Sequence, residues 1–141
     1  MDCRDKKLSN KSKKLPLSAK KKIIIDRIES LYQNIIKVYF KTKKRQYNLV
    51  PGFTYYYHLL NDKYIYFTYW KNKDISVDFP FGSPKWCIYY LVFNKDDKFV
   101  AITISINPYK LDYFTKSINH LSYAELLYFY NLIKKLVILL V

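Results

Sequence analysis

The chain has 141 residues, enough for one domain with a substantial hydrophobic core, and half of its residues are hydrophobic. Its 25 basic residues against 11 acidic ones give a net charge of +14. The composition excludes a chain that is disordered throughout, and the charge favours a polyanionic partner such as nucleic acid or an anionic membrane surface. No uncharged apolar run reaches the length of a membrane helix, and no signal-peptide core follows the N-terminus.

The basic residues are 22 Lys and three Arg, and the abundant Lys, Ile, Tyr and Asn all have A/T-rich codons. Part of the charge can therefore reflect genome composition. Lys acts as a point charge, whereas bidentate reading of guanine or phosphate needs a guanidinium group, so nonspecific backbone contact is the better interpretation. The two cysteines, Cys3 and Cys87, form neither a disulfide framework nor a zinc motif, which predicts a reducing, cytoplasmic compartment.

Residues 1–17 are predicted to be a disordered basic tail, and residues 18–141 a single α+β domain. We expect Ser18 to cap an amphipathic helix over about residues 19–40. Its apolar positions recur every three or four residues, as on one helical face: Ile24, Ile28, Leu31, Tyr32, Ile35 and Tyr39. Basic residues follow at 41 and 43–45, which is favourable at a helix C-terminus and also forms a second basic cluster.

From about residue 53 to 106, apolar and polar residues alternate with period two, which predicts a roughly five-stranded antiparallel meander. The third strand contains Ser76 and Asp78, and this indicates an edge strand or a solvent face. The last two strands, Trp86–Asn94 and Phe99–Ile106, form a hairpin across Lys95–Lys98. Both faces of this hairpin are largely apolar, so we expect it in the middle of the sheet with a cover on each side.

Beyond the sheet, a short helix is predicted around Leu111–Ile118. Ser122 and Glu125 form a capping box that starts an apolar helix over about residues 123–141. Lys134 and Lys135 in its middle argue against a transmembrane span. The helix is expected to be buried against the sheet or, alternatively, against a second copy of the chain in a homodimer.

The sequence contains few groups for catalysis, since it has two His, two Glu and two Cys. His58 and His120 are interpreted as structural, and no metal-binding, redox or nucleotide motif occurs, so no cofactor and no bound metal are predicted. One alternative is a nuclease in which Asp78 and Asp97 hold Mg²⁺ and Lys98 orients the phosphate. Asp and Lys are also common in polar hairpin turns, which is the simpler explanation of Asp97 and Lys98.

Aromatic residues interleaved with lysines suggest a surface on which unpaired bases stack, formed by Tyr55, Tyr57, Tyr64, Tyr66, Trp70, Tyr89 and Tyr90. Alternatively, Tyr replaces Phe and Leu in an A/T-rich genome and packs with its hydroxyl at the surface. The sequence therefore predicts a small, non-enzymatic protein from a virus or mobile element that binds DNA or RNA. The expected phosphate contacts are Lys6, Lys7, Lys11, Lys13, Lys14, Lys20, Lys21, Lys22, Lys41, Lys43, Lys44 and Arg45. The alternatives are the Mg²⁺-dependent nuclease and a protein interaction module that dimerises through the C-terminal helix.

Overall fold

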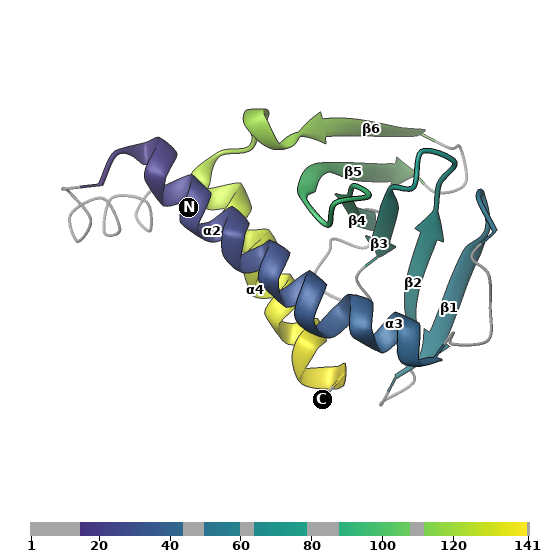
Figure 1. Ribbon diagram of the computed structural model, residues 1–141. Helices are drawn as coiled ribbons and strands as arrows, with labels where there is room; N and C mark the ends of the chain where they lie inside the picture. Colours follow the sequence, from purple (N-terminus) through teal and green to yellow (C-terminus); the bar gives the residue numbers. More distant parts are fainter. Residues whose placement is uncertain (1–14, 44–49, 60–63, 79–87, 108–111, 141) are drawn as a thin grey trace.

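The computed structural model describes residues 15–43, 50–59, 64–78, 88–107 and 112–140. It confirms the α+β class: a long N-terminal helix, an antiparallel sheet and a C-terminal helix follow one another along the chain (Figure 1). Most of the predicted tail, residues 1–14, lies outside the described residues.

The N-terminal helix consists of three continuous segments: α2 (Leu17–Leu31), the π-helix η1 (Tyr32–Ile36) and α3 (Lys37–Lys43). It begins two residues before the predicted start at Ala19, and the prediction of Ser18 as its cap is wrong. The N-cap is Pro16, whose carbonyl accepts hydrogen bonds from the backbone N–H groups of Ala19 and Lys20, both at 3.1 Å. An extended proline supplies the first acceptor without needing an N–H of its own.

The π-helix explains which helical positions are buried. The buried row advances in steps of four and is formed by Ile24, Ile28, Tyr32, Ile36 and Phe40. With 3.6 residues per turn, each step of four rotates the row by about 40° around an α-helix. The wider i→i+5 turns of η1 offset this drift, so the row stays buried along its whole length, first beside the C-terminal helix and then, at Tyr32 and Phe40, against the sheet. The predicted stripe was wrong in this part, because Ile35 and Tyr39 are only partly buried.

The sheet has six strands in the order in which they occur in the sequence. They are β1 (Thr54–His58), β2 (Tyr64–Tyr69), β3 (Ile75–Asp78), β4 (Ile88–Phe93), β5 (Phe99–Asn107) and β6 (Asp112–Ser117). All neighbours are antiparallel, and the strand direction turns strongly from β6 to β1 (Figure 1). The prediction of a meander is confirmed, with one strand more than expected.

One sequence-based prediction about the sheet is wrong, and another is right only in its second alternative. Residues 112–117 form β6 rather than a short helix, because Tyr113, Phe114 and Thr115 favour a pleated strand and the edge of β5 is there to pair with. The third strand is not an edge strand, since β3 lies between β2 and β4, but Ser76 and Asp78 do lie on the side of the sheet that no described helix covers, which was the alternative prediction. Ser76 is nevertheless only 7% exposed, and its hydroxyl accepts a hydrogen bond from the Trp70 indole.

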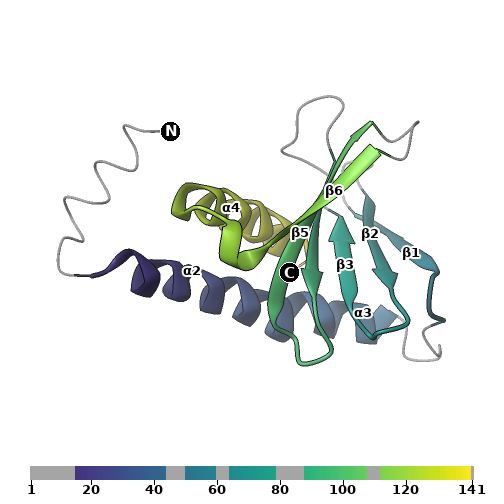
Figure 2. The same cartoon turned by 90° about the horizontal axis from the view of Figure 1, so that it is seen from above.

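Both helices pack on the same face of the sheet, here called the covered face (Figure 2). Tyr32 stacks on Phe93 with ring centroids 3.8 Å apart, and Phe40 stacks on Phe67 at 4.0 Å. From α4 (Tyr123–Leu140), Phe129 meets Tyr89 edge to face. Among the described residues no helix lies on the opposite face, here called the open face, so the expected cover on both sides is wrong for this part of the chain.

The start of α4 confirms the predicted capping box. The Ser122 hydroxyl accepts a hydrogen bond from the Glu125 backbone N–H, and the Glu125 carboxylate accepts one from the Ser122 N–H. Burial alone would raise the pKa of Glu125, but the bonds from Ser122 and the ammonium of Lys116 outweigh it and lower that pKa. Within the described residues, no helix has both the length and the hydropathy needed to cross a membrane.

Candidate nucleic-acid interface

The open face carries a group of three exposed tyrosines on the first hairpin, here called the tyrosine cluster. Tyr56 of β1 lies opposite Tyr66 of β2, and Tyr64 follows on the same side of β2. Their exposed fractions are 64%, 39% and 38%, respectively. The ring centroids lie 6.0 to 6.3 Å from one another. Three flat, accessible aromatic faces are thus held together on rigid, paired strands.

The alternation of the strands divides the predicted aromatic set between the two faces. Tyr55 and Tyr57 of β1 and Tyr89 of β4 point toward the helices, where each makes ring contacts. The remaining predicted residues, Tyr64, Tyr66, Trp70 and Tyr90, lie on the open face. Tyr56 was missing from the predicted set, although the same period-two pattern that places Tyr55 on one face places Tyr56 on the other.

Trp70 stands beside a hollow of about 760 Å³ in the open face. Its indole N–H donates a hydrogen bond to the Ser76 hydroxyl at 2.8 Å, which fixes the ring although it is 47% exposed. The floor of the hollow consists of short side chains from four neighbouring strands: Ser76, Val92, Ala101, Thr103 and Thr115. We call this site the Trp70 hollow.

Polar groups of the β2–β3 turn form one rim of the Trp70 hollow. Lys71, Asn72 and Asp74 line it. The Asn72 side-chain N–H donates to the Asp74 carboxylate at 3.1 Å, and the Asp74 backbone N–H donates to the Asn72 side-chain oxygen at 3.0 Å. Lys73 of the same turn has φ of 71° and is exposed. The turn therefore carries one lysine that lines the hollow and a second two residues further along the chain, and neither was among the phosphate contacts predicted from the sequence.

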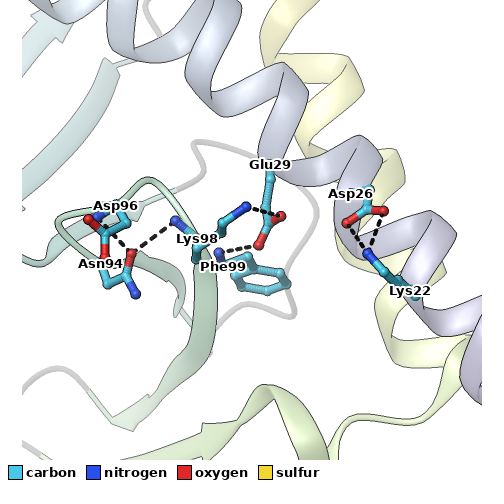
Figure 3. Close-up of polar contacts among 7 residues, drawn as sticks. All are labelled: Lys22, Asp26, Glu29, Asn94, Asp96, Lys98 and Phe99. Carbon is cyan, nitrogen blue, oxygen red and sulfur yellow. Dashed lines mark hydrogen bonds and ion pairs between the residues drawn. The ribbon is translucent and has the colours of Figure 1, made fainter.

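The lysines that were predicted from the sequence to contact phosphates and that the structure describes lie on the N-terminal helix. Lys20, Lys21 and Lys22 are in the first turns of α2 and Lys41 is in α3, about 30 Å away at 1.5 Å per residue. Lys20 lies 5.5 Å from the centroid of the Tyr123 ring, and Lys22 pairs with Asp26 at 3.0 Å (Figure 3). The side chain of Lys43 and the other selected residues, Lys6, Lys7, Lys11, Lys13, Lys14, Lys44 and Arg45, lie outside the described part of the chain.

The structure does not bring the candidate nuclease residues together. Asp97 pairs with Lys37 of α3 at 2.6 Å, on the helix side, and Lys98 lies 3.8 Å from Glu29 of α2. Asp78 lies on the open face, opposite Tyr90 of β4. The chain reaches Asp97 only beyond the end of β4 at Phe93, which is three residues, or about 10 Å, from Tyr90. No three His, Cys, Asp or Glu side chains of the described residues are grouped so as to hold a metal ion.

The outer surface of α4 is mixed rather than uniformly apolar. Its exposed residues, as far as the helix is described, are Asn131, Lys134, Lys135 and Ile138. The apolar side chains that made this helix a candidate dimer seam, such as Leu132 and Leu136, are buried in the core of the same chain. Beside the exposed Ile138, the apolar residues Val137, Leu139 and Leu140 are partly exposed, and a homodimer through α4 stays a prediction.

Compared with protein-family models, with curated proteins and with solved structures, the chain matches none. Function is therefore argued from the arrangement of the side chains alone.

Proposed function

We propose that this protein is a non-enzymatic nucleic-acid-binding protein that binds unpaired strands of DNA or RNA through the open face of its sheet. The observation that carries the proposal is the tyrosine cluster: Tyr56, Tyr64 and Tyr66 expose their rings side by side on a face that no described helix covers. An unpaired base stacked on an aromatic side chain contributes about 1–3 kcal/mol, whichever base it is.

The tyrosine cluster is not needed to build the core. The covered face already contributes Phe67, Leu91 and Phe93 to a continuous apolar core with both helices. A solvent-facing strand can take Thr or Ser at such positions, and five other positions of the same face do: Thr54, Thr68, Ser76, Thr103 and Thr115. Exposed aromatic rings held side by side on one face of a sheet are typical of a binding surface.

The positive charge of the chain is the second contribution to the proposed affinity for nucleic acid. A net charge of +14 attracts phosphates over a long range; Lys71 lines the Trp70 hollow, and the exposed Lys73 belongs to the same turn. The lysines of the N-terminal tail and of both helix ends add further contacts to the sugar–phosphate backbone in this proposal. Because almost all of these cations are Lys, the affinity depends on salt and little on sequence.

Stacking explains why single strands are preferred. In a duplex each base is stacked between its neighbours and cannot lie on a protein ring, whereas unpaired bases can turn outward onto the tyrosine cluster. Phosphate contact alone would instead favour the duplex, which has the higher charge density.

Fluorescence anisotropy with a labelled oligothymidine of about 12 nucleotides and a duplex of equal length tests the proposal. We expect tighter binding of the single strand at about 50 mM salt, and a steep loss of affinity by about 200 mM. The double variant Tyr56→Leu/Tyr66→Leu keeps the apolar bulk but removes two aromatic faces. It should bind the single strand at least tenfold more weakly.

Two controls make the result specific. Tyr56→Phe/Tyr66→Phe keeps both rings and should retain the affinity of the natural chain. Phe114→Leu changes an aromatic ring that is 48% exposed on the covered side of β6 and should also leave the affinity unchanged. Equal binding by the Leu and Phe double variants, or binding that salt does not weaken, contradicts the proposal.

A further inference from the structure

The Trp70 hollow offers a flat ring one aromatic wall and a floor of short side chains. Its wall is an indole held by the bond to Ser76, so no ordering of this side chain is left to occur on binding. The surface is recessed at its floor because neighbouring strands from β3 to β6 all carry short side chains there. For example, Ser76 is opposite Val92, and Val92 is opposite Ala101. A β-bulge next to Val92 brings Val100 to the same hollow.

The hollow continues the line of the tyrosine cluster. Tyr64, Tyr66, Thr68 and Trp70 are alternate residues of one extended segment, so they lie on one side of it. At about 3.3 Å per residue, Trp70 is about 13 Å from Tyr66. A strand whose bases stack on the tyrosines can thus reach Trp70 without a change in the protein, with Lys71 and Lys73 beside its phosphates.

We propose, building on the function above, that the Trp70 hollow binds one unpaired base that carries an exocyclic amino group. The base stacks on the Trp70 indole, which has the largest aromatic face available to it. The Asp74 carboxylate lines the rim, and Asn72 donates to one of its oxygens, Oδ2. Carboxylates accept hydrogen bonds from the amino group of cytosine, whereas uracil and thymine present a carbonyl oxygen at that position. The hollow thus adds base preference to an otherwise sequence-independent surface.

Tryptophan fluorescence of the full chain tests the proposal with single nucleotides. The sequence has two tryptophans, so the variant Trp86→Phe leaves Trp70 as the one reporter. Titration with CMP should quench Trp70 to saturation, and CMP should bind at least severalfold more tightly than UMP. Asp74→Asn in the same background should remove this difference, since an amide both donates and accepts hydrogen bonds.

Filling the hollow provides the matched control. Ala101→Phe places a large ring on the floor without changing Trp70, and it should abolish quenching by CMP, while Phe114→Ala at the sheet edge should not. Circular dichroism and thermal unfolding confirm that each variant is folded.

Different experimental outcomes would overturn this proposal and the proposed function. If anisotropy shows single-strand binding but neither CMP nor an oligonucleotide changes Trp70 fluorescence, the hollow is not a base site and the tyrosine cluster acts alone. Equal affinity for CMP and UMP overturns the role of Asp74. If CMP quenches Trp70 but no oligonucleotide binds at any salt concentration, the base site stands and the single-strand function is overturned.

Discussion

At the scale of single residues, the core contains a buried polar group without a hydrogen-bond partner among the described residues. Tyr32 is fully buried, and its hydroxyl has no hydrogen-bond partner among the described residues. Burial, and then the nearby negative charge of Asp97, raise the pKa of this phenol. The Tyr32 ring itself packs well, because it stacks almost parallel to Phe93 with an interplanar angle of 5°.

Replacing Tyr32 by Phe should therefore stabilise the protein. The variant keeps the stack on Phe93 and removes a buried hydroxyl without a partner, a group that costs about 1–3 kcal/mol. We expect the free energy of unfolding in urea to rise by about 1 kcal/mol. Tyr130→Phe, on the partly exposed side of α4, is the control and should change it by less than about 0.5 kcal/mol. A clear loss of stability in Tyr32→Phe would mean that the hydroxyl is hydrogen bonded.

Residues whose role depends on local chemistry were predictable from the sequence. The capping box of Ser122 and Glu125 needs only four consecutive residues to form, and it forms as expected. The polar hairpin turn at residues 94–98 is equally local: Asn94 Oδ1 accepts hydrogen bonds from the N–H groups of Asp96 and Lys98 (Figure 3). Asp97, with φ of 63°, occupies there a conformation that glycine usually takes.

At the scale of elements, the N-terminal helix is fixed to the central hairpin by charged side chains as well as by its apolar row. The Glu29 carboxylate of α2 accepts a hydrogen bond from the backbone N–H of Phe99 at 2.9 Å, and Lys98 lies 3.8 Å from it (Figure 3). On the next turns, Lys37 pairs with Asp97 of the same hairpin. Glu29 and Lys37 lie before and after Tyr32 in the helix, and their contacts hold it in register with the β4–β5 hairpin.

Glu29→Ala should destabilise the protein by about 1–3 kcal/mol, because it leaves the Phe99 N–H at the start of β5 without its acceptor. Asp26→Ala provides the control on the same helix. Its side chain is 54% exposed and pairs with Lys22, so its loss should cost about 0.5 kcal/mol or less. Chemical denaturation measures both variants, and equal effects would show that the Glu29 contact does not fix the helix.

Elements that depend on distant partners were less predictable. In the second half of the helix, from η1 onward, the buried positions are Ile36 and Phe40, each one residue after the predicted Ile35 and Tyr39, and the spacing of apolar residues does not reveal a π-helix. Residues 112–117 have both a helical and an extended interpretation, and pairing with β5 decides between them. The period-two pattern predicted the other strands correctly because alternation is a local property.

The whole molecule places aromatic and basic groups differently from the simplest prediction. The tyrosine cluster and the Trp70 hollow share the open face, whereas Lys20 to Lys22 and Lys41 lie on the helix that packs against the covered face (Figure 2). The sequence revealed that aromatic residues and lysines alternate along the chain, but a one-dimensional pattern does not indicate which of them share a surface. Phosphate contacts from the helix and stacking on the sheet therefore need not occur together.

The central claim is that unpaired bases stack on the open face. Aromatic carbon–proton NMR spectra of the tyrosine-labelled protein, recorded during titration with an oligothymidine of about 12 nucleotides, test it most directly. Tyrosines on the other face of the sheet provide an internal control, because Tyr56, Tyr64 and Tyr66 face solvent while Tyr55 and Tyr57 of β1 and Tyr89 of β4 lie on the covered face. Ring-current shifts should appear on the first three tyrosines and not on the second three. Binding that shifts neither set, or shifts both equally, would contradict the account.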